Sequence, residues 1–173
     1  PHSSGMMRLA FFLLPLLFLA GCVGYRPVDQ VDRELALAPV LNQDGPPGLA
    51  GPLSRSLREK LAASPNWNLL PADNAAAVLH VALTATGRDV LANDPADTGR
   101  PLSYRQTVEV RLRWEGGAPP WGGSSAERVL RTQIQLFSQP SLVEAGQSAL
   151  PDLADRIARR IVQELQGSRL SGE

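Results

Sequence analysis

The sequence predicts a single α+β domain, a two-layer sandwich in which two helices pack on one face of a mostly antiparallel sheet. Leucine and isoleucine recur at every fourth residue within 49–61 and 149–166, which is the spacing of an amphipathic helix. Apolar and polar residues alternate in 78–86, 104–115 and 127–137, which predicts half-buried strands. Because each element has a single apolar face, helices and sheet are expected to bury one another.

The first half of this domain is expected to contain two short strands around the first helix. Residues 34–40 alternate weakly and predict a first strand, and the Asp, Gly and Pro residues of 42–48 predict a turn. The first helix is expected to stop at 64–66, where a proline interrupts it. Residues 67–70 predict a short strand and 71–74 a turn. The apolar stripe of the helix consists of Leu49, Leu53, Leu57 and Leu61.

The second half is expected to supply the main sheet and the second helix. The segment 104–115 has the cleanest alternation, from Tyr104 to Trp114 on the apolar face. A Gly- and Pro-rich loop, 116–125, is too long for a tight hairpin and precedes the last strand. The final helix has a broad apolar stripe under a charged face and is expected to end at Gly167. Its stripe contains Leu153, Ile157, Ile161 and Leu165.

The residues before this domain have the pattern of a bacterial lipoprotein signal. Arg8 provides a positive n-region, and residues 9–19 form an apolar stretch too short to cross a bilayer as a helix. Leu19-Ala20-Gly21-Cys22 resembles a lipobox, so Cys22, the single cysteine of the chain, is expected to become a lipidated N-terminus. We therefore expect four parts: a leader 1–21 that starts with a vector scar or mis-assigned start, a lipidated tether 22–33, the domain 34–167, and a disordered tail 168–173.

The charge balance excludes some classes of partner. The chain has 17 basic and 17 acidic residues, and the leader contains one arginine and no acid, so the expected mature charge is about −1. This balance argues against nucleic acid as a partner. All the basic residues except Lys60 are arginines, whose guanidinium binds phosphate or carboxylate through a bidentate fork.

No motif in the sequence predicts catalysis. His80 is the only histidine after the leader, and no Cys, His or carboxylate cluster has the spacing of a zinc site. Ser124 and Ser125 lack a Gly-x-Ser-x-Gly frame, and the paired glycines of 116–123 do not lie between a strand and a helix. The sequence therefore predicts a protein that is not an enzyme and has no catalytic residues, no cofactor and no metal site.

The polar face of the predicted sheet is rich in arginine. One interpretation is a solvated face with cross-strand charge pairs, for instance with Glu109. The other is a cationic surface for phosphorylated ligands or a protein wall, because charge-assisted hydrogen bonds are stronger than neutral ones. The arginines expected opposite the helices, near His80 and Thr84, are Arg105, Arg111, Arg113 and Arg131.

The loop 116–125 presents a second candidate, because Trp121 lies between prolines and glycines. An exposed tryptophan at such a tip can anchor an interface. It can equally fold back over the core, and the sequence leaves both possibilities open.

The layout of the whole chain resembles a known family. A lipobox is followed at once by Gly24-Tyr25-Arg26, and the first helix ends in Leu57-Arg-Glu-Lys-Leu61. Three long strands precede an arginine-rich helix with Asp155-Arg-Ile-Ala-Arg-Arg-Ile161. This order is similar to that of LptE, the lipopolysaccharide-assembly lipoprotein family.

The resemblance implies an outer-membrane lipoprotein that faces the periplasm and sits inside the β-barrel protein LptD as plug and assembly partner. It also implies that the chain binds lipopolysaccharide during export, through basic side chains on the sheet side. No local motif aligns those side chains with this sequence. Geometry alone therefore assigns ligand binding to Arg105, Arg111, Arg113 and Arg131.

Two other functions remain open at this point. The chain could be a periplasmic lipoprotein of an ABC-type lipid transport system, whose partner is a membrane-tethered lipid shuttle. It could also activate a cell-wall synthase, but that function needs a long tether, and only about ten residues separate Cys22 from the first strand. An aspartate directly after the lipidated cysteine would resemble a signal for retention in the inner membrane. Val23 and Gly24 stand there instead, so we expect the protein to be sorted to the outer membrane.

Overall fold

The structure, a computed structural model, describes residues 33–97, 99, 101–137 and 142–166. Cys22, the expected leader 1–21 and the expected tail 168–173 lie outside the described residues. In chain order the elements are β1 (Arg33–Leu37), β2 (Leu41–Asn42), α2 (Ala50–Ala62), β3 (Trp67–Leu69), the 3-10 helix η2 (Ala72–Asn74), β4 (Ala77–Asn93), β5 (Pro101–Glu115), β6 (Glu127–Phe137) and α3 (Leu142–Gln166).

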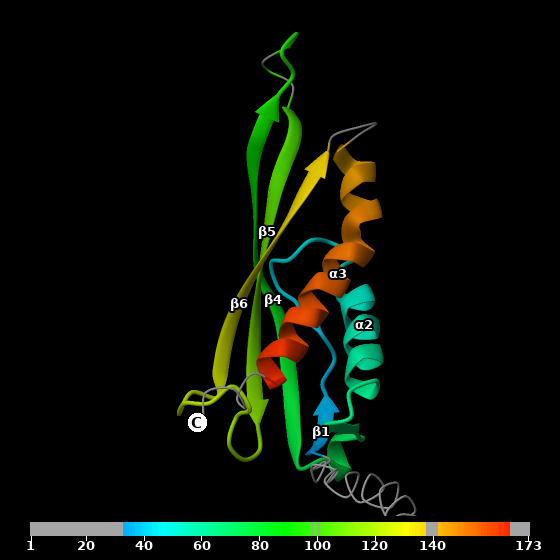
Figure 1. The fold of residues 1–173 in the computed structure, drawn as a ribbon, viewed down its shortest axis with the longest axis vertical. Helices are drawn as coiled ribbons and strands as arrows, with labels where there is room; N and C mark the ends of the chain where they lie inside the picture. Colours follow the sequence, from blue (N-terminus) through cyan, green and yellow to red (C-terminus); the bar gives the residue numbers. More distant parts are fainter. Residues whose placement is uncertain (1–32, 98, 100, 138–141, 167–173) are drawn as a thin grey trace, which may run out of the picture. The chain divides into compact units, whose positions relative to one another are not determined.

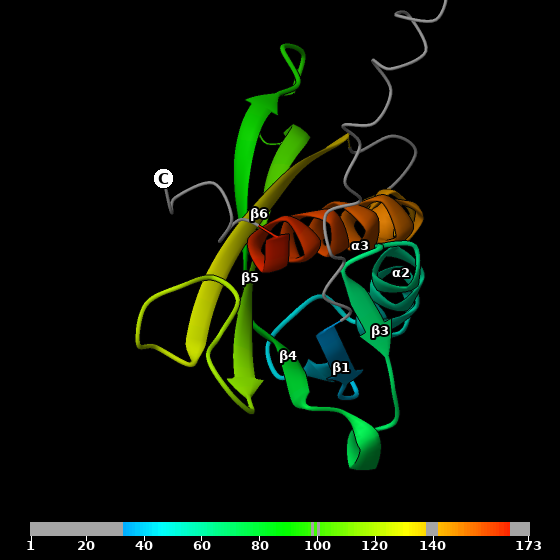
Figure 2. The same cartoon turned by 60° about the horizontal axis from the view of Figure 1, so that its bottom comes forward.

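The strands form one mixed sheet in the order β3-β1-β4-β5-β6, with β2 also paired to β4. The two long ladders, β4 with β5 and β5 with β6, are antiparallel. The short ladders of β1 with β3, β1 with β4 and β2 with β4 are parallel. Helices α2 and α3 lie together on one face of this sheet (Figure 1), and a turned view shows the same two layers (Figure 2). The predicted α+β two-layer sandwich is confirmed.

The core lies between the sheet and the helices. Along β5 the residues from Tyr104 to Trp114 alternate between buried and exposed, so the face predicted to be apolar is the face that packs on the helices. The apolar stripes of α2 and α3 meet this face. Leu53, Leu57 and Ile161 are fully or almost fully buried. Neither described helix combines the length and the apolar character that a transmembrane span requires.

Two elements extend further than the sequence predicts. β4 continues to Asn93 instead of ending near residue 86, and the β4–β5 register shifts between Leu83 and Ala85. Before this bulge the even-numbered residues of β4 point outward, and after it the odd-numbered residues do. The regular alternation of apolar and polar residues is therefore interrupted, and the sequence does not predict the second half of the strand. α3 begins at Leu142, although Pro151 lies inside it. Because proline is common in the first turn of helices, Pro151 leads the sequence analysis to place the start of this helix near residue 149.

An ion-pair cluster links the polar sides of the two helices. Asp155 of α3 lies 2.6 Å from the Nζ of Lys60 in α2 and 2.9 Å from the guanidinium of Arg159. The Ser56 hydroxyl also donates to it, at 3.5 Å. The hydrogen bond from Lys60 is the main reason why the pKa of Asp155 is lowered, with the charges of Lys60 and Arg159 adding to it and desolvation opposing it.

Asp155→Asn is therefore expected to destabilise the domain slightly at neutral pH. Because the pKa of Asp155 is lower in the folded chain than the ordinary value of about 3.9, its contribution is complete above that value and disappears as pH falls through the folded pKa. The side chain is 37% exposed, so we expect a loss of about 0.5–1 kcal/mol. Thermal unfolding should show a gap between wild type and variant that is constant from pH 7 to about 5 and shrinks as pH falls below the ordinary carboxyl value of about 3.9 and through the lower folded pKa.

The control for this measurement is Asp152→Asn, which removes only the exposed pair with Arg156 within α3. Its effect at neutral pH should be smaller, because an i,i+4 pair contributes about 0.3–0.5 kcal/mol. A gap for Asp155→Asn that persists unchanged at low pH would show that the loss comes from packing and not from charge.

Candidate functional site: the arginine face of the sheet

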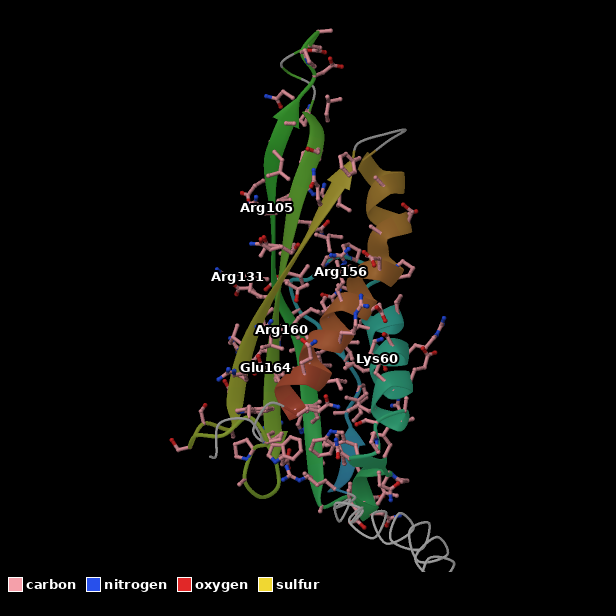
Figure 3. All side chains as sticks on the ribbon, viewed as in Figure 1. Lys60, Arg105, Arg131, Arg156, Arg160 and Glu164 are labelled. Atoms are coloured by element: carbon pink, nitrogen blue, oxygen red, sulfur yellow. The ribbon has the colours of Figure 1, made fainter. Side chains whose placement is uncertain are left out.

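The structure brings the four predicted arginines to one face of the sheet, opposite the helices. Arg105, Arg111 and Arg113 occupy the exposed alternate positions of β5, and Arg131 is exposed on β6. The register sets Arg113 beside His80 of β4 and Arg131 beside Glu109. Figure 3 shows Arg105 and Arg131 on the strands, remote from Lys60 on α2.

These four arginines differ in their ion pairs. The Nε of Arg131 donates to Glu109 at 3.0 Å, and Arg113 lies 3.7 Å from Glu115, which also accepts from His80 at 2.8 Å. Among the described residues, no carboxylate lies within 4 Å of the guanidinium of Arg105 or Arg111. Two of the arginines therefore form charge pairs across or along the strands, as the first interpretation expects. The other two have no acidic partner among the described residues, and ligand binding by them stays a prediction.

The arginine face also carries exposed apolar side chains. Val129 lies opposite Arg111 in the register and is 56% exposed, and Phe137 at the end of β6 is 64% exposed. An exposed apolar side chain beside the guanidinium of Arg111 fits an amphiphile better than it fits a small inorganic ion.

Trp121 folds back onto the domain. Its ring packs edge-to-face on Trp114 with the centroids 6.0 Å apart, and Trp114 contacts Trp67 in the same way. The indole Nε1 of Trp121 donates to the carbonyl oxygen of Ser125 at 3.1 Å. This residue therefore closes one end of the core, and of the two possibilities that the sequence left open, the structure favours this one over a free interface anchor.

A cavity of about 260 Å³ lies between the inner face of the sheet and the first half of α3. Its walls include Ile134, Leu150 and Leu153, together with Arg88 and the buried amide of Gln106. The guanidinium of Arg88 stacks over the Tyr104 ring at 5.9 Å. A cavity that is mostly apolar, with one cation on its wall, matches a hydrocarbon chain that carries an anionic group.

Sequence reasoning missed three arginines that lie near Arg131. Arg156, Arg159 and Arg160 of α3 line a shallow groove together with Arg131. In the sequence they read as the charged face of a helix, because no local pattern indicates which side of α3 lies next to β6. Only the packing of α3 beside β6 shows that the two sets of arginines are neighbours.

His80 and the acidic residues do not form a metal site in the described part of the chain. The structure has no group of three or more His, Asp, Glu or Cys side chains there that could hold an ion. His80 instead contacts Glu115 on the exposed face of the sheet.

Comparisons with known proteins agree with this architecture. A family model described as LptE, lipopolysaccharide-assembly, matches residues 33–165. No curated protein matches the chain. Solved structures do match: rare lipoprotein B from Shewanella oneidensis is 18% identical with a TM-score of 0.52, covering 78% of this chain and 96% of that chain. A minor lipoprotein from Acinetobacter baumannii is 16% identical with a TM-score of 0.54, covering 80% of this chain and 95% of that one.

An uncharacterized lipoprotein B from Nitrosomonas europaea is 12% identical with a TM-score of 0.55, covering 86% of this chain and 94% of that chain. At such low identity these three structures establish the shared fold only. The family model rests on the sequence itself and extends from β1 to the end of α3.

Proposed function

Since the chain belongs to the LptE family of lipopolysaccharide-assembly proteins, we propose that it is an outer-membrane lipoprotein that faces the periplasm and partners an LptD-type β-barrel. In this role it acts as the plug of the barrel and binds lipopolysaccharide during transport, without catalysis. The match of the family model from residue 33 to residue 165 is the observation that carries the proposal.

The proposed attachment is through lipid on Cys22. Three acyl chains, at about 0.8 kcal/mol for each buried CH₂ group, make such an anchor stable, whereas a single chain binds a membrane only reversibly. With the leader 1–21 removed, the tether 22–33 holds the domain 34–167 close to the bilayer, where a barrel partner is accessible. A radiolabelled palmitate incorporation assay on wild type and Cys22→Ala tests this step directly.

The proposed ligand contact combines free cations with apolar surface. Arg105 and Arg111, which have no acidic partner in the described part of the chain, offer guanidinium donors to phosphate groups, whereas Arg113 and Arg131 first have to leave Glu115 and Glu109. The cavity under α3 offers room for a hydrocarbon chain. Lipopolysaccharide carries both phosphates and acyl chains, so this arrangement supports it as the ligand.

The test of the proposed partner is affinity purification of the full chain from detergent-solubilised membranes. Recovery of a large outer-membrane β-barrel in stoichiometric amount is the expected result. Recovery of a lipid-shuttle complex instead would favour a lipoprotein of an ABC-type lipid transport system, the second function that fits the anchor and the fold. A cell-wall synthase in the eluate would favour the activator function, against which the short tether argues.

Arg105→Ala combined with Arg111→Ala is expected to weaken lipopolysaccharide binding about tenfold, because both free guanidinium groups are lost. The matched control is Arg55→Ala combined with Arg58→Ala, which removes the same charge from exposed positions of α2. Binding of the full chain to lipopolysaccharide in a pull-down should stay within about twofold of wild type for the control. Equal losses in both variants would contradict a local site on the arginine face.

A further inference from the structure

Helix α3 has two halves that the core holds very differently. In the second half, residues 152–166, six apolar side chains are almost completely buried, namely Leu153, Ala154, Ile157, Ala158, Ile161 and Leu165. In the first half none of residues 145–150 is buried, and Leu150 is the largest apolar side chain among them. Figure 1 shows the first turns of α3 beyond the end of α2, whereas the middle of α3 lies beside it. We call residues 145–150 the lid.

Pro151 separates the lid from the second half of α3. Proline has no N–H, so the carbonyl oxygen of Gln147 loses its helical hydrogen bond, and the proline ring is crowded against the same carbonyl. Helices bend at such positions, because the ladder of main-chain hydrogen bonds is interrupted there. The junction between the two halves is therefore the natural hinge of α3.

Two residues inside the lid weaken its helical structure further. Gly146 favours the helix less than any other residue type except proline. The Ser148 hydroxyl donates to the carbonyl oxygen of Ala145 at 3.2 Å, and such a bond competes with the main-chain bonds of the helix. A segment with few buried contacts and weak helical bonds has a low free energy of local opening. The lid meets both conditions.

The lid covers the cavity between α3 and the sheet, which has a volume of about 260 Å³. The wall on the lid side consists of Gly146, Gln147 and Leu150. Ile134 of β6 lines the cavity on the sheet side, and Leu153 lines it from the buried half of the helix. Movement of the lid about Pro151 thus uncovers the cavity while the core stays intact.

We propose that the lid opens about Pro151 as a unit and controls access to this cavity, while residues 152–166 remain packed. In the closed state of the structure, Leu150 packs against the core beside the cavity. One half-buried leucine holds the lid far more weakly than six buried side chains hold the second half of the helix. The proposal concerns this chain alone and goes beyond the proposed function, because it holds for any molecule that enters the cavity.

Hydrogen exchange of the full chain in nonionic detergent, followed by mass spectrometry, tests whether the lid opens separately. The amides of residues 146–150 are expected to exchange at least about tenfold faster than those of residues 157–165. Pro151→Ala restores the missing N–H donor and should slow exchange of the lid about tenfold or more. Equal exchange in both halves, or a lid that is unaffected by Pro151→Ala, would overturn the proposal.

Gly146→Ala is a milder variant that should slow exchange of the lid about fivefold, because alanine favours a helix more than glycine does. Among the described residues, nothing outside the backbone of the helix lies within 4 Å of the added Cβ, so the substitution introduces no steric strain. The matched control is Gly51→Ala in α2, whose added Cβ is equally free of neighbours. It should leave exchange of the lid within about twofold of wild type. Equal slowing in both variants would mean that the lid opens only when the whole domain unfolds.

Access to the cavity is measured separately, by the reaction of N-ethylmaleimide with a thiol introduced as Ile134→Cys. This thiol should react at least about tenfold faster than that of Ile161→Cys, which belongs to the buried half of α3. Gly146→Ala should slow the reaction of Ile134→Cys about fivefold, and Gly51→Ala should leave it within about twofold. The unsubstituted chain, whose single cysteine is Cys22, gives the background. If Ile134→Cys reacts as slowly as Ile161→Cys, or if both glycine variants slow it equally, the lid does not control access to the cavity.

Discussion

Gly116→Ala is expected to destabilise the domain by about 3 kcal/mol, because two penalties act on one backbone position. Gly116 has a φ of +97°, a region that residues with a side chain rarely adopt. A Cβ atom there would lie 2.5 Å from the carbonyl oxygen of Ala76 and 3.0 Å from the Cα of Ala77. Both neighbours are backbone atoms at the start of β4 and cannot turn aside as a side-chain tip would.

Gly117→Ala is the matched control, since Gly117 also has a positive φ, +63°, but no atom lies within 4 Å of its hypothetical Cβ. It should cost only the conformational penalty, about 1 kcal/mol. Urea unfolding of both variants should therefore give free energies of unfolding that differ by about 2 kcal/mol, which is the steric penalty at Gly116. Equal losses would mean that β4 and the loop after Glu115 can move apart, and that the close approach is not a constraint.

The periodic elements of this fold are predictable from sequence because each one follows its own local rule. The strand β5 alternates from Tyr104 to Trp114, and the stripe of α2 repeats every fourth residue, and both are buried on the face that the pattern indicates. Neither pattern depends on where the rest of the chain lies.

The remaining parts depend on pairing or on exceptions to local rules. β2, Leu41–Asn42, is only two residues long and is a strand because it pairs with β4. The outer half of β4 is hidden by a bulge, and the first turns of α3 by Pro151. In each case tertiary contacts outweigh the local preference.

The candidate site also has one part that the sequence predicts and one part that depends on tertiary structure. Alternation along β5 and β6 is sufficient to place Arg105, Arg111 and Arg131 on one face. The register is needed to know that Glu109 pairs with Arg131 and leaves Arg111 free. The shallow groove lined by Arg131 and the arginines of α3 needs still more, since its position depends on which side of α3 packs beside β6.

That packing rests on the contact between the two helices, which gives the second large prediction. Leu57→Ala in α2 is expected to lower the free energy of unfolding by about 2–5 kcal/mol, the range for deleting a buried leucine side chain. Leu57 is fully buried, and α2 packs mainly on α3 and β3. The substitution leaves a cavity in the core where α2 packs on α3. The lost stability should appear as a lower urea concentration at the midpoint of unfolding.

Leu41→Ala makes the same chemical change at a position that is 57% exposed and should cost about 0.5 kcal/mol or less. If both variants lost the same amount, the leucine stripe of α2 would not be the support of the helical layer. A larger loss for Leu57→Ala, with an unchanged dependence on urea concentration, would show that burial of this stripe stabilises the helical layer. This buried layer is also what holds α3 beside β6, because the apolar stripe of α3 packs into the same core.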